Sequence, residues 1–205
     1  MDLQDAPFFS VDVETTGLDL GKDEIIAFAC LPIRLGRIVV HEAYYTLVKS
    51  QNYRIDSMKY HGISEGDLEE MPIFEQIAGE ILERTDGVLV GHSVEFDYAF
   101  LRKHFRKMGI RLKREAIDIV KIEEWLGEKT GRRAPDLTLE GLMKKYGLTS
   151  YYRHNAFADA FFTAQIFQFE LPELSQLGVK RLDQLIHLTG GGSKIWRVLF
   201  SDELI

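Results

Sequence analysis

The segment Val11-Asp12-Val13-Glu14, which closes an apolar run beginning at Phe8, constrains the fold more than any other part of the chain. Successive side chains of a strand point to opposite faces, so the two valines face a core while Asp12 and Glu14 share the other face. Two carboxylates this close repel unless a hard divalent cation or a proton relieves the charge. The pattern therefore predicts a metal site, although solvated strands also alternate acidic and apolar residues.

The order of strand-type and helix-type segments is typical of a mixed α/β sheet. Strand composition covers residues 8–13, 25–33 and 37–48, with turn signals between them. Beyond residue 64 the chain alternates short strands (87–91, 116–119) with helical patterns (73–82, 94–108, 137–146 and 155–169), and Ser93 is a candidate helix N-cap. We expect a mixed five-stranded sheet, three antiparallel strands followed by parallel ones, flanked by helices.

The length and the distribution of glycine suggest one domain with a short tail. A chain of 205 residues can bury one sizeable core, and we assign residues 1–172 to the domain. Residues 173–205 contain a Gly-Gly-Gly-Ser break at 190–193 and a short apolar end. This tail is interpreted either as a docking segment or as a segment packed back on the domain. Residues 184–188 faintly resemble a sliding-clamp motif.

Composition excludes several classes of protein. The hydrophobic content of 45% is ordinary for a soluble protein, and no stretch approaches the roughly 20 apolar residues that a membrane span requires. The acidic N-terminus lacks the features of a secretory signal, so a cytoplasmic location without a membrane partner is expected. The single cysteine, Cys30, lies in an apolar run and is expected in the core.

A net charge of −7 argues against nucleic-acid binding by bulk electrostatics. One region is nevertheless basic, and it holds Arg102, Lys103, Arg106, Lys107, Arg111, Lys113 and Arg114. These residues could form a solvated helix face. They could equally form a patch that follows a nucleic-acid backbone.

Two further acids, Asp97 and Asp159, each lie early in an expected helix. Helix N-termini favour anions, so either residue alone would be explained by the helix dipole. His154 stands just ahead of the second helix, with Asp159 about one turn further in. A potential general base and a potential metal ligand therefore share one short segment.

Four segments, V-D-V-E-T-T-G-L, H-G-I, G-H-S-V-E-F-D and H-N-A-F-A-D-A, occur in this order within about residues 7–170. Together they resemble the DEDDh (DnaQ-like) 3′-5′ exonuclease family, and they are most similar to the epsilon-type proofreading exonuclease of bacterial DNA polymerase III. The resemblance implies a ribonuclease H-like fold. It also implies metal-dependent release of nucleoside monophosphates from the 3′ end of single-stranded or frayed DNA, in proofreading or repair.

The resemblance also assigns roles to residues. Asp12, Glu14, Asp97 and Asp159 would hold two divalent cations, Mg²⁺ or Mn²⁺, and His154 would be the general base. Substrate contacts would come from Thr15, Leu18, His61 and Phe96. Without the resemblance, these four would be interpreted as turn or packing residues. Ser93 departs from the asparagine that many members have after the histidine of the third motif.

Two other functions remain open. An exoribonuclease would use the same chemistry on RNA, although the H-G-I and H-x-A-x-x-D-A segments favour DNA. A polymerase-docking module would retain the fold without catalysis, but no metal-binding acid is missing from this chain. The expected partners are single-stranded DNA or a primer 3′ terminus, with RNA as the alternative, and a DNA polymerase subunit is a candidate protein partner.

Overall fold

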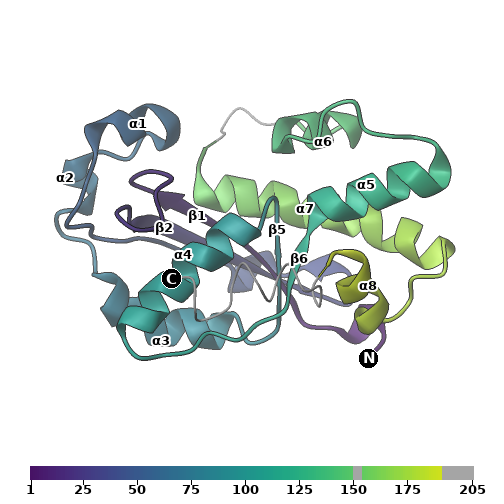
Figure 1. The fold of residues 1–205 in the computed structure, drawn as a ribbon, viewed down its shortest axis with the longest axis horizontal. Helices are drawn as coiled ribbons and strands as arrows, with labels where there is room; N and C mark the ends of the chain where they lie inside the picture. Colours follow the sequence, from purple (N-terminus) through teal and green to yellow (C-terminus); the bar gives the residue numbers. More distant parts are fainter. Residues whose placement is uncertain (150–153, 191–205) are drawn as a thin grey trace.

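A mixed β-sheet forms the centre of the computed structural model, which describes residues 1–149 and 154–190 (Figure 1). The strand order is β3-β2-β1-β5-β6, and β4 also pairs with β2. The strands are β1 (Phe8–Thr15), β2 (Ile25–Arg34), β3 (Arg37–Ile38), β4 (Tyr44–Leu47), β5 (Val88–Gly91) and β6 (Ala116–Asp118). β2 runs antiparallel to β1, β3 and β4, whereas β5 is parallel to both β1 and β6. The expected mixed α/β sheet is confirmed.

The strand count differs from the expected five, because residues 37–48 do not form one strand. A 3₁₀ turn, Val40–Glu42, separates β3 from β4. The interruption lies opposite Pro32 of β2, whose carbonyl accepts the Val39 N–H at 2.8 Å. Proline has no N–H to return a ladder hydrogen bond, so pairing stops there and the sheet has six named strands.

Helices cover both faces of the sheet (Figure 1). Val11 and Val13 of β1 are buried in a core shared with α3 (Phe74–Arg84) and α4 (Glu95–Lys107). The opposite face carries α7 (Ala156–Gln176), α5 (Ile119–Thr130) and α6 (Leu139–Lys145), which share a second core with Phe8. The alternation predicted for β1 is therefore present.

Residues 173–190 are part of the same folded unit as the residues before them. α7 passes through Pro172 and ends at Gln176, rather than near residue 169 as the sequence suggested. α8 (Leu182–Leu188) then packs back, with Leu185 fully buried and the Leu182 N–H bonded to the carbonyl of Met1 at 3.0 Å. The expected boundary at 172 thus falls inside a continuous helix. Residues 191–205, with most of the glycine-rich break, lie outside the described residues.

The sequence missed α1 (Ile55–His61) and α5. The short helix α2 (Glu65–Leu68) begins with a capping box formed by Ser64 and Asp67. The signals for α5 were present, because Asp118 is its N-cap and Ile119, Ile122 and Leu126 are buried at helical spacing. Over residues 1–149 and 154–190, no helix has both the length and the apolar character needed to cross a bilayer.

Candidate active site

Three carboxylates from two elements meet at the end of β1. Asp12 and Glu14 project from β1, and Asp159 projects from the first turn of α7. Each offers an oxygen atom that lies within 4.8 Å of the oxygens offered by the other two. Oxygen donors at this separation suit a hard divalent cation, which also relieves the repulsion among the three charges.

The start of α7 is fixed by hydrogen bonds around Asn155. Its side-chain oxygen caps the helix by accepting the Ala158 N–H at 3.2 Å, and its carbonyl accepts the Asp159 N–H at 2.9 Å. One residue further on, the carbonyl of Ala160 accepts a hydrogen bond from Ser10 Oγ of β1 at 2.7 Å. The helix that carries Asp159 is therefore tied directly to the strand that carries Asp12 and Glu14.

Asp97 lies beside this carboxylate group, in the first turn of α4. It is only 4% exposed, and its Oδ1 accepts the backbone N–H of Val13 at 2.9 Å. Burial raises the pKa of the Asp97 carboxyl to about 8, and the nearby charges of Glu14 and Asp118 add to the shift, although its backbone hydrogen bonds oppose it. A cation next to Asp97 would favour its ionised form.

The turn before α4 has an unusual backbone. Ser93 has a positive φ of 56°, and its N–H donates to Oδ1 of Asp118 at 3.0 Å. Ser93 is therefore not the helix N-cap that the sequence suggested; Val94 occupies that position and makes no side-chain capping bond. Asp118 is a positioning residue that the motifs did not reveal. It restrains the turn before Asp97 and also caps α5.

His154 immediately precedes the N-cap of α7. It also has a positive φ, 57°, and it is exposed. Its side chain lines the same cleft as Glu14, but it is not one of the three clustered carboxylate donors. His154 therefore lines the cleft without belonging to the three-carboxylate group.

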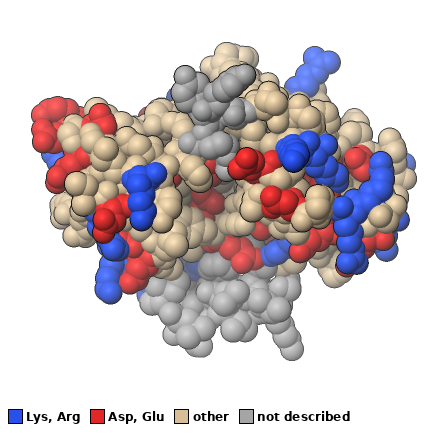
Figure 2. Space-filling view, turned by 90° about the horizontal axis from the view of Figure 1, so that it is seen from above, with Lys and Arg blue, Asp and Glu red and all other residues tan. Residues whose placement is uncertain are grey.

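A cleft of about 560 Å³ opens next to the carboxylates. All four residues expected to touch substrate, Thr15, Leu18, His61 and Phe96, line it. Leu18 is 85% exposed, so it is not an ordinary packing residue. Figure 2 views the molecule from the side of α1 and α6. Acidic side chains are spread over this face, including its middle, whereas lysines and arginines lie mainly to either side.

His61 presents a defined hydrogen-bonding state to the cleft. Its Nδ1 accepts the backbone N–H of Ile63 at 3.0 Å, so in the neutral ring the proton is on Nε2. Nε2 is buried and has no partner among the described residues. Burial lowers the pKa of the ring, which favours this neutral form. Among the residues that the structure describes, His61 is thus a donor without an acceptor.

One wall of the cleft comes from Ser57 and Tyr60 of α1 and from Arg54, its N-cap residue. The sequence did not point to this wall, because the helix reverses the usual amphipathic pattern. Its buried residues are Ser57 and His61, whereas Ile55 is 77% exposed and Tyr60 is 62% exposed. The spacing of four residues between Ser57 and His61, about one helical turn, was the one sequence signal that could have indicated this helix face.

The sheet, with carboxylates at the end of β1 and at the starts of α4 and α7, defines a nuclease of the DEDD class. A family model described as Exonuclease (RNase_T) matches residues 9–167, and the chain belongs to this family. The family expected from the four motifs is therefore confirmed.

Among known proteins, the DNA polymerase III PolC-type of Thermotoga maritima is 33% identical over 184 residues, which cover 88% of this chain and 13% of the polymerase. The 3′-5′ exonuclease DinG of Staphylococcus aureus (strain USA300) is 29% identical over 188 residues, which cover 90% of this chain and 20% of that protein. The chain thus spans a small part of the length of the relatives that it matches.

The fold is also found in solved structures. The nuclease domain of 3′hExo, a DEDDh family member bound to rAMP, superposes with a TM-score of 0.69 at 16% identity. The match covers 88% of this chain and 98% of that domain. The ribonuclease H-like fold expected from the sequence is confirmed.

Proposed function

We propose that this chain is a metal-dependent 3′-5′ exonuclease that releases nucleoside monophosphates from the end of a DNA strand. The observation that carries the proposal is the three-carboxylate group of Asp12, Glu14 and Asp159, which adjoins a cleft lined by residues suited to hold a strand terminus. The relative named as a 3′-5′ exonuclease supports hydrolysis from the 3′ end, and the relative named as a DNA polymerase supports DNA as the substrate.

The donor set fits divalent cations. Asp12, Glu14 and Asp159 supply hard oxygens, and Asp97 adds a fourth carboxylate beside them. We propose that they hold two ions, Mg²⁺ or Mn²⁺. When bound, such a pair stabilises the charge on the attacking and leaving oxygens of an in-line displacement at phosphorus. The protein's part is to keep the four carboxylates in place, which the bonds from Val13 to Asp97 and from Ser10 to Ala160 achieve.

His154 is the proposed general base. His154 is exposed and lines the cleft that Glu14 also lines. A neutral imidazole nitrogen can accept a proton from an attacking water. The left-handed backbone at His154 turns the chain into α7, which keeps the base and Asp159 on one short, capped segment.

The remaining cleft residues suit the end of a strand. Leu18 and Phe96 offer apolar surface on which unpaired bases can stack. His61 would donate its Nε2–H to an oxygen of the terminal nucleotide once the ring becomes accessible to substrate, which would supply the acceptor that is absent among the described residues. Thr15 follows the acidic pair directly and lies against the same space.

DNA is the proposed substrate, in a proofreading or repair context, with a DNA polymerase subunit as the candidate protein partner. The PolC-type relative supports this context. RNA is the second candidate, because the superposed nuclease domain of 3′hExo is bound to rAMP. We propose that the protein acts in the cytoplasm.

The proposal is tested with 3′-labelled and 5′-labelled single-stranded DNA and matching RNA, incubated with Mg²⁺, Mn²⁺ or EDTA. We expect metal-dependent shortening from the 3′ end, faster on DNA. Asp12→Asn should abolish it. Asp86→Asn, which removes an exposed carboxylate elsewhere, is the matched control and should leave the rate unchanged. Absence of shortening on both polymers would refute the enzymatic function.

A further inference from the structure

A second hollow, separate from the catalytic cleft, lies at the C-terminal end of α4. It has a volume of about 200 Å³ and is lined by Arg102, Lys103, Arg106, Gly109, Ile110, Arg111 and Leu112. Four of these seven residues are basic and none is acidic, in a chain whose net charge is −7. We call it the α4 basic pocket.

The backbone turn that follows α4 brings the arginines together. α4 ends at Lys107, and Gly109 follows the C-cap residue Met108 with a φ of +73°. The Ile110 N–H returns to the carbonyl of Phe105 at 2.9 Å. This closure is a Schellman-type cap, and it turns the chain back along the helix. Leu112 is then buried in the core, so the returning segment is anchored. Arg111 therefore comes back alongside Arg102 and Arg106.

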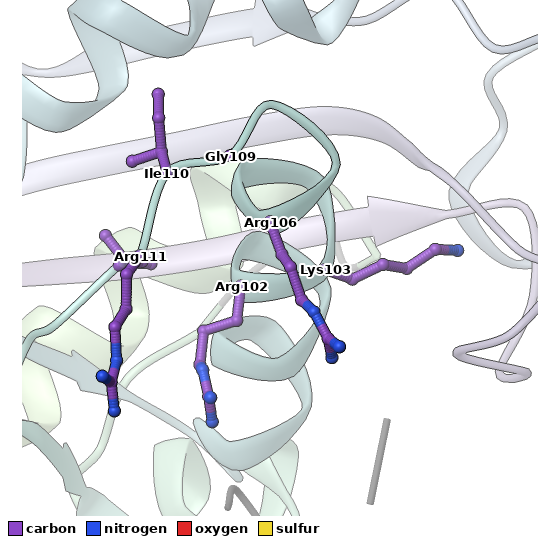
Figure 3. Close-up of a pocket in the computed structure, with 7 residues that line it drawn as sticks. Arg102, Lys103, Arg106, Gly109, Ile110 and Arg111 are labelled. Atoms are coloured by element: carbon purple, nitrogen blue, oxygen red, sulfur yellow. The ribbon is translucent and has the colours of Figure 1, made fainter. Parts of the chain in front are cut away.

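Figure 3 shows the result: the side chains of Arg102, Arg106 and Arg111 extend in the same direction, whereas Lys103 extends away from them. Lys103 has a structural role, because its ammonium group donates to the carbonyl of Asp23. Arg114, further along the chain, is likewise structural, since it donates to the carbonyl of Thr85 at 2.7 Å. Two members of the basic region, Lys103 and Arg114, therefore bond to the backbone of other elements, and three arginines line one hollow.

The helix dipole does not explain this arrangement. A helix C-terminus attracts cations in its last turn, which accounts for Arg106 and Lys107. Arg111 lies beyond the helix end, and Arg102 lies more than a turn before it. A guanidinium group is planar and can donate two parallel hydrogen bonds to the oxygens of a phosphate. Ile110 adds an apolar surface that suits the sugar or base beside a phosphate.

We propose that the α4 basic pocket binds backbone phosphates of the DNA strand whose 3′ end lies in the catalytic cleft. This inference rests on the proposed exonuclease function. α4 joins the two sites, because Phe96 lines the cleft and Arg106 lines the pocket. Ten residues of helix separate them by about 15 Å. At a rise of about 3.4 Å per nucleotide, the pocket meets the strand about four to five nucleotides from its end.

The test compares strand lengths. The variant is Arg106→Gln with Arg111→Gln, since both side chains are exposed and the fold should persist. The matched control, Arg37→Gln with Lys180→Gln, removes two exposed charges from elsewhere on the full chain. Binding of fluorescently labelled thymidine oligonucleotides of about 3 and about 12 nucleotides is measured in EDTA over a range of salt concentrations.

For the longer strand, we expect the variant to bind roughly 10-fold more weakly and the slope of log K against log salt to fall by about 1.4, or about 0.7 per lost phosphate contact. Binding and metal-dependent cleavage of the short strand should be unchanged. The control should match the wild-type protein throughout. An unchanged slope, an equal loss on the short strand, or no measurable binding of the longer strand by the wild-type protein would overturn the proposal.

These results separate the inference from the function on which it rests. Normal cleavage of the short strand with no effect of the variant would refute the α4 basic pocket as a DNA site, retain the exonuclease, and leave an acidic protein segment as the occupant to seek. Binding that depends on the pocket, without shortening of any polymer, would support the pocket and refute the exonuclease.

Discussion

The backbone N–H of Val13 donates to Oδ1 of Asp97 at 2.9 Å, so the acid of α4 is bonded to the strand residue between Asp12 and Glu14. Asp97 and Val13 are 84 residues apart in sequence. The bond places a buried carboxylate beside two others, and the position of α4 therefore sets the position of one acid relative to the rest of the site.

We expect Asp97→Asn to lower the exonuclease rate by at least about 100-fold. The amide oxygen can still accept the Val13 N–H, so the fold should persist, but a negative charge beside the metal site is lost, and such charges contribute several kcal/mol to catalysis. Steady-state cleavage of 3′-labelled DNA with Mg²⁺ measures the effect. A rate close to that of the wild-type protein would exclude a role for Asp97 in holding cations.

Asp97 should also make the metal-free protein less stable as the pH rises. Its pKa is about 8 in the folded chain and ~3.9 when unfolded. The raised value means that its contribution is complete below pH ~4 and is lost as the pH rises through 8, at about 1.4 kcal/mol per pH unit at most. Urea unfolding in EDTA at pH 5, 7 and 9 should show Asp97→Asn gaining stability relative to the wild type with pH. A constant difference would contradict the shifted pKa.

We expect His61→Phe to reduce kcat/KM by roughly 10-fold, the value of one lost hydrogen bond to substrate. The ring keeps similar bulk but loses the Nε2–H that lacks a partner among the described residues. The substitution also removes the acceptor of the Ile63 N–H, so a control must disturb the same turn. Tyr53→Phe does so, because the Tyr53 hydroxyl donates to the carbonyl of Ile63. An equal loss in both variants would indicate a structural effect alone.

Replacing Glu170 of α7 should stabilise the protein. Its carboxylate is fully buried, and neither oxygen has a hydrogen-bond partner among residues 1–149 and 154–190. Burial, followed by the charge of Glu123, raises its pKa well above the ordinary value, so its contribution to stability is lost as the pH rises. Glu170→Met should add roughly 1–3 kcal/mol to the unfolding free energy, and more at pH 9 than at pH 6. Glu173→Met on the same helix is the comparison, and a Glu170 variant less stable than wild type at both pH values would refute the argument.

Leu185→Ala should cost about 2–5 kcal/mol of stability, because Leu185 is fully buried in the core shared with Phe8 and α7. This residue falls in the segment that faintly resembles a clamp motif, yet its side chain packs inside the protein. Thermal and urea unfolding measure the loss. Ile186→Ala, one residue along the same helix, should cost less because Ile186 is only partly buried. Equal effects would mean that α8 does not depend on Leu185 for its packing.

The sequence predicted those parts of the fold that depend on the periodicity of apolar residues and on the order of strands and helices along the chain. The alternation of Asp12 and Glu14 with two valines identified both the central strand and its acidic face, and α4 and α7 begin close to where capping and spacing placed them. It failed where tertiary contacts decide. α7 continues through Pro172, because burial of Leu174 outweighs the local preference of proline to end a helix.

Within the site, the motifs named residues but not their partners. The tautomer of His61 depends on the Ile63 N–H, and the turn at Ser93 depends on Asp118, which stands 25 residues later in the chain. Neither hydrogen bond is indicated by a local sequence motif. The α1 helix was missed because its two buried residues, Ser57 and His61, are polar, whereas its apolar residues Ile55, Met58 and Tyr60 are exposed. This is the reverse of the pattern that reveals a surface helix.

Two of the three non-glycine residues with a positive φ in the described part of the chain, Ser93 and His154, stand directly before the helices that carry Asp97 and Asp159. Glycine would adopt this backbone at lower cost. At position 154, however, glycine could not accept a proton. The stability of the fold and the proposed role of His154 as general base therefore make opposite demands on that residue, and selection for thermal tolerance alone would tend to replace the histidine.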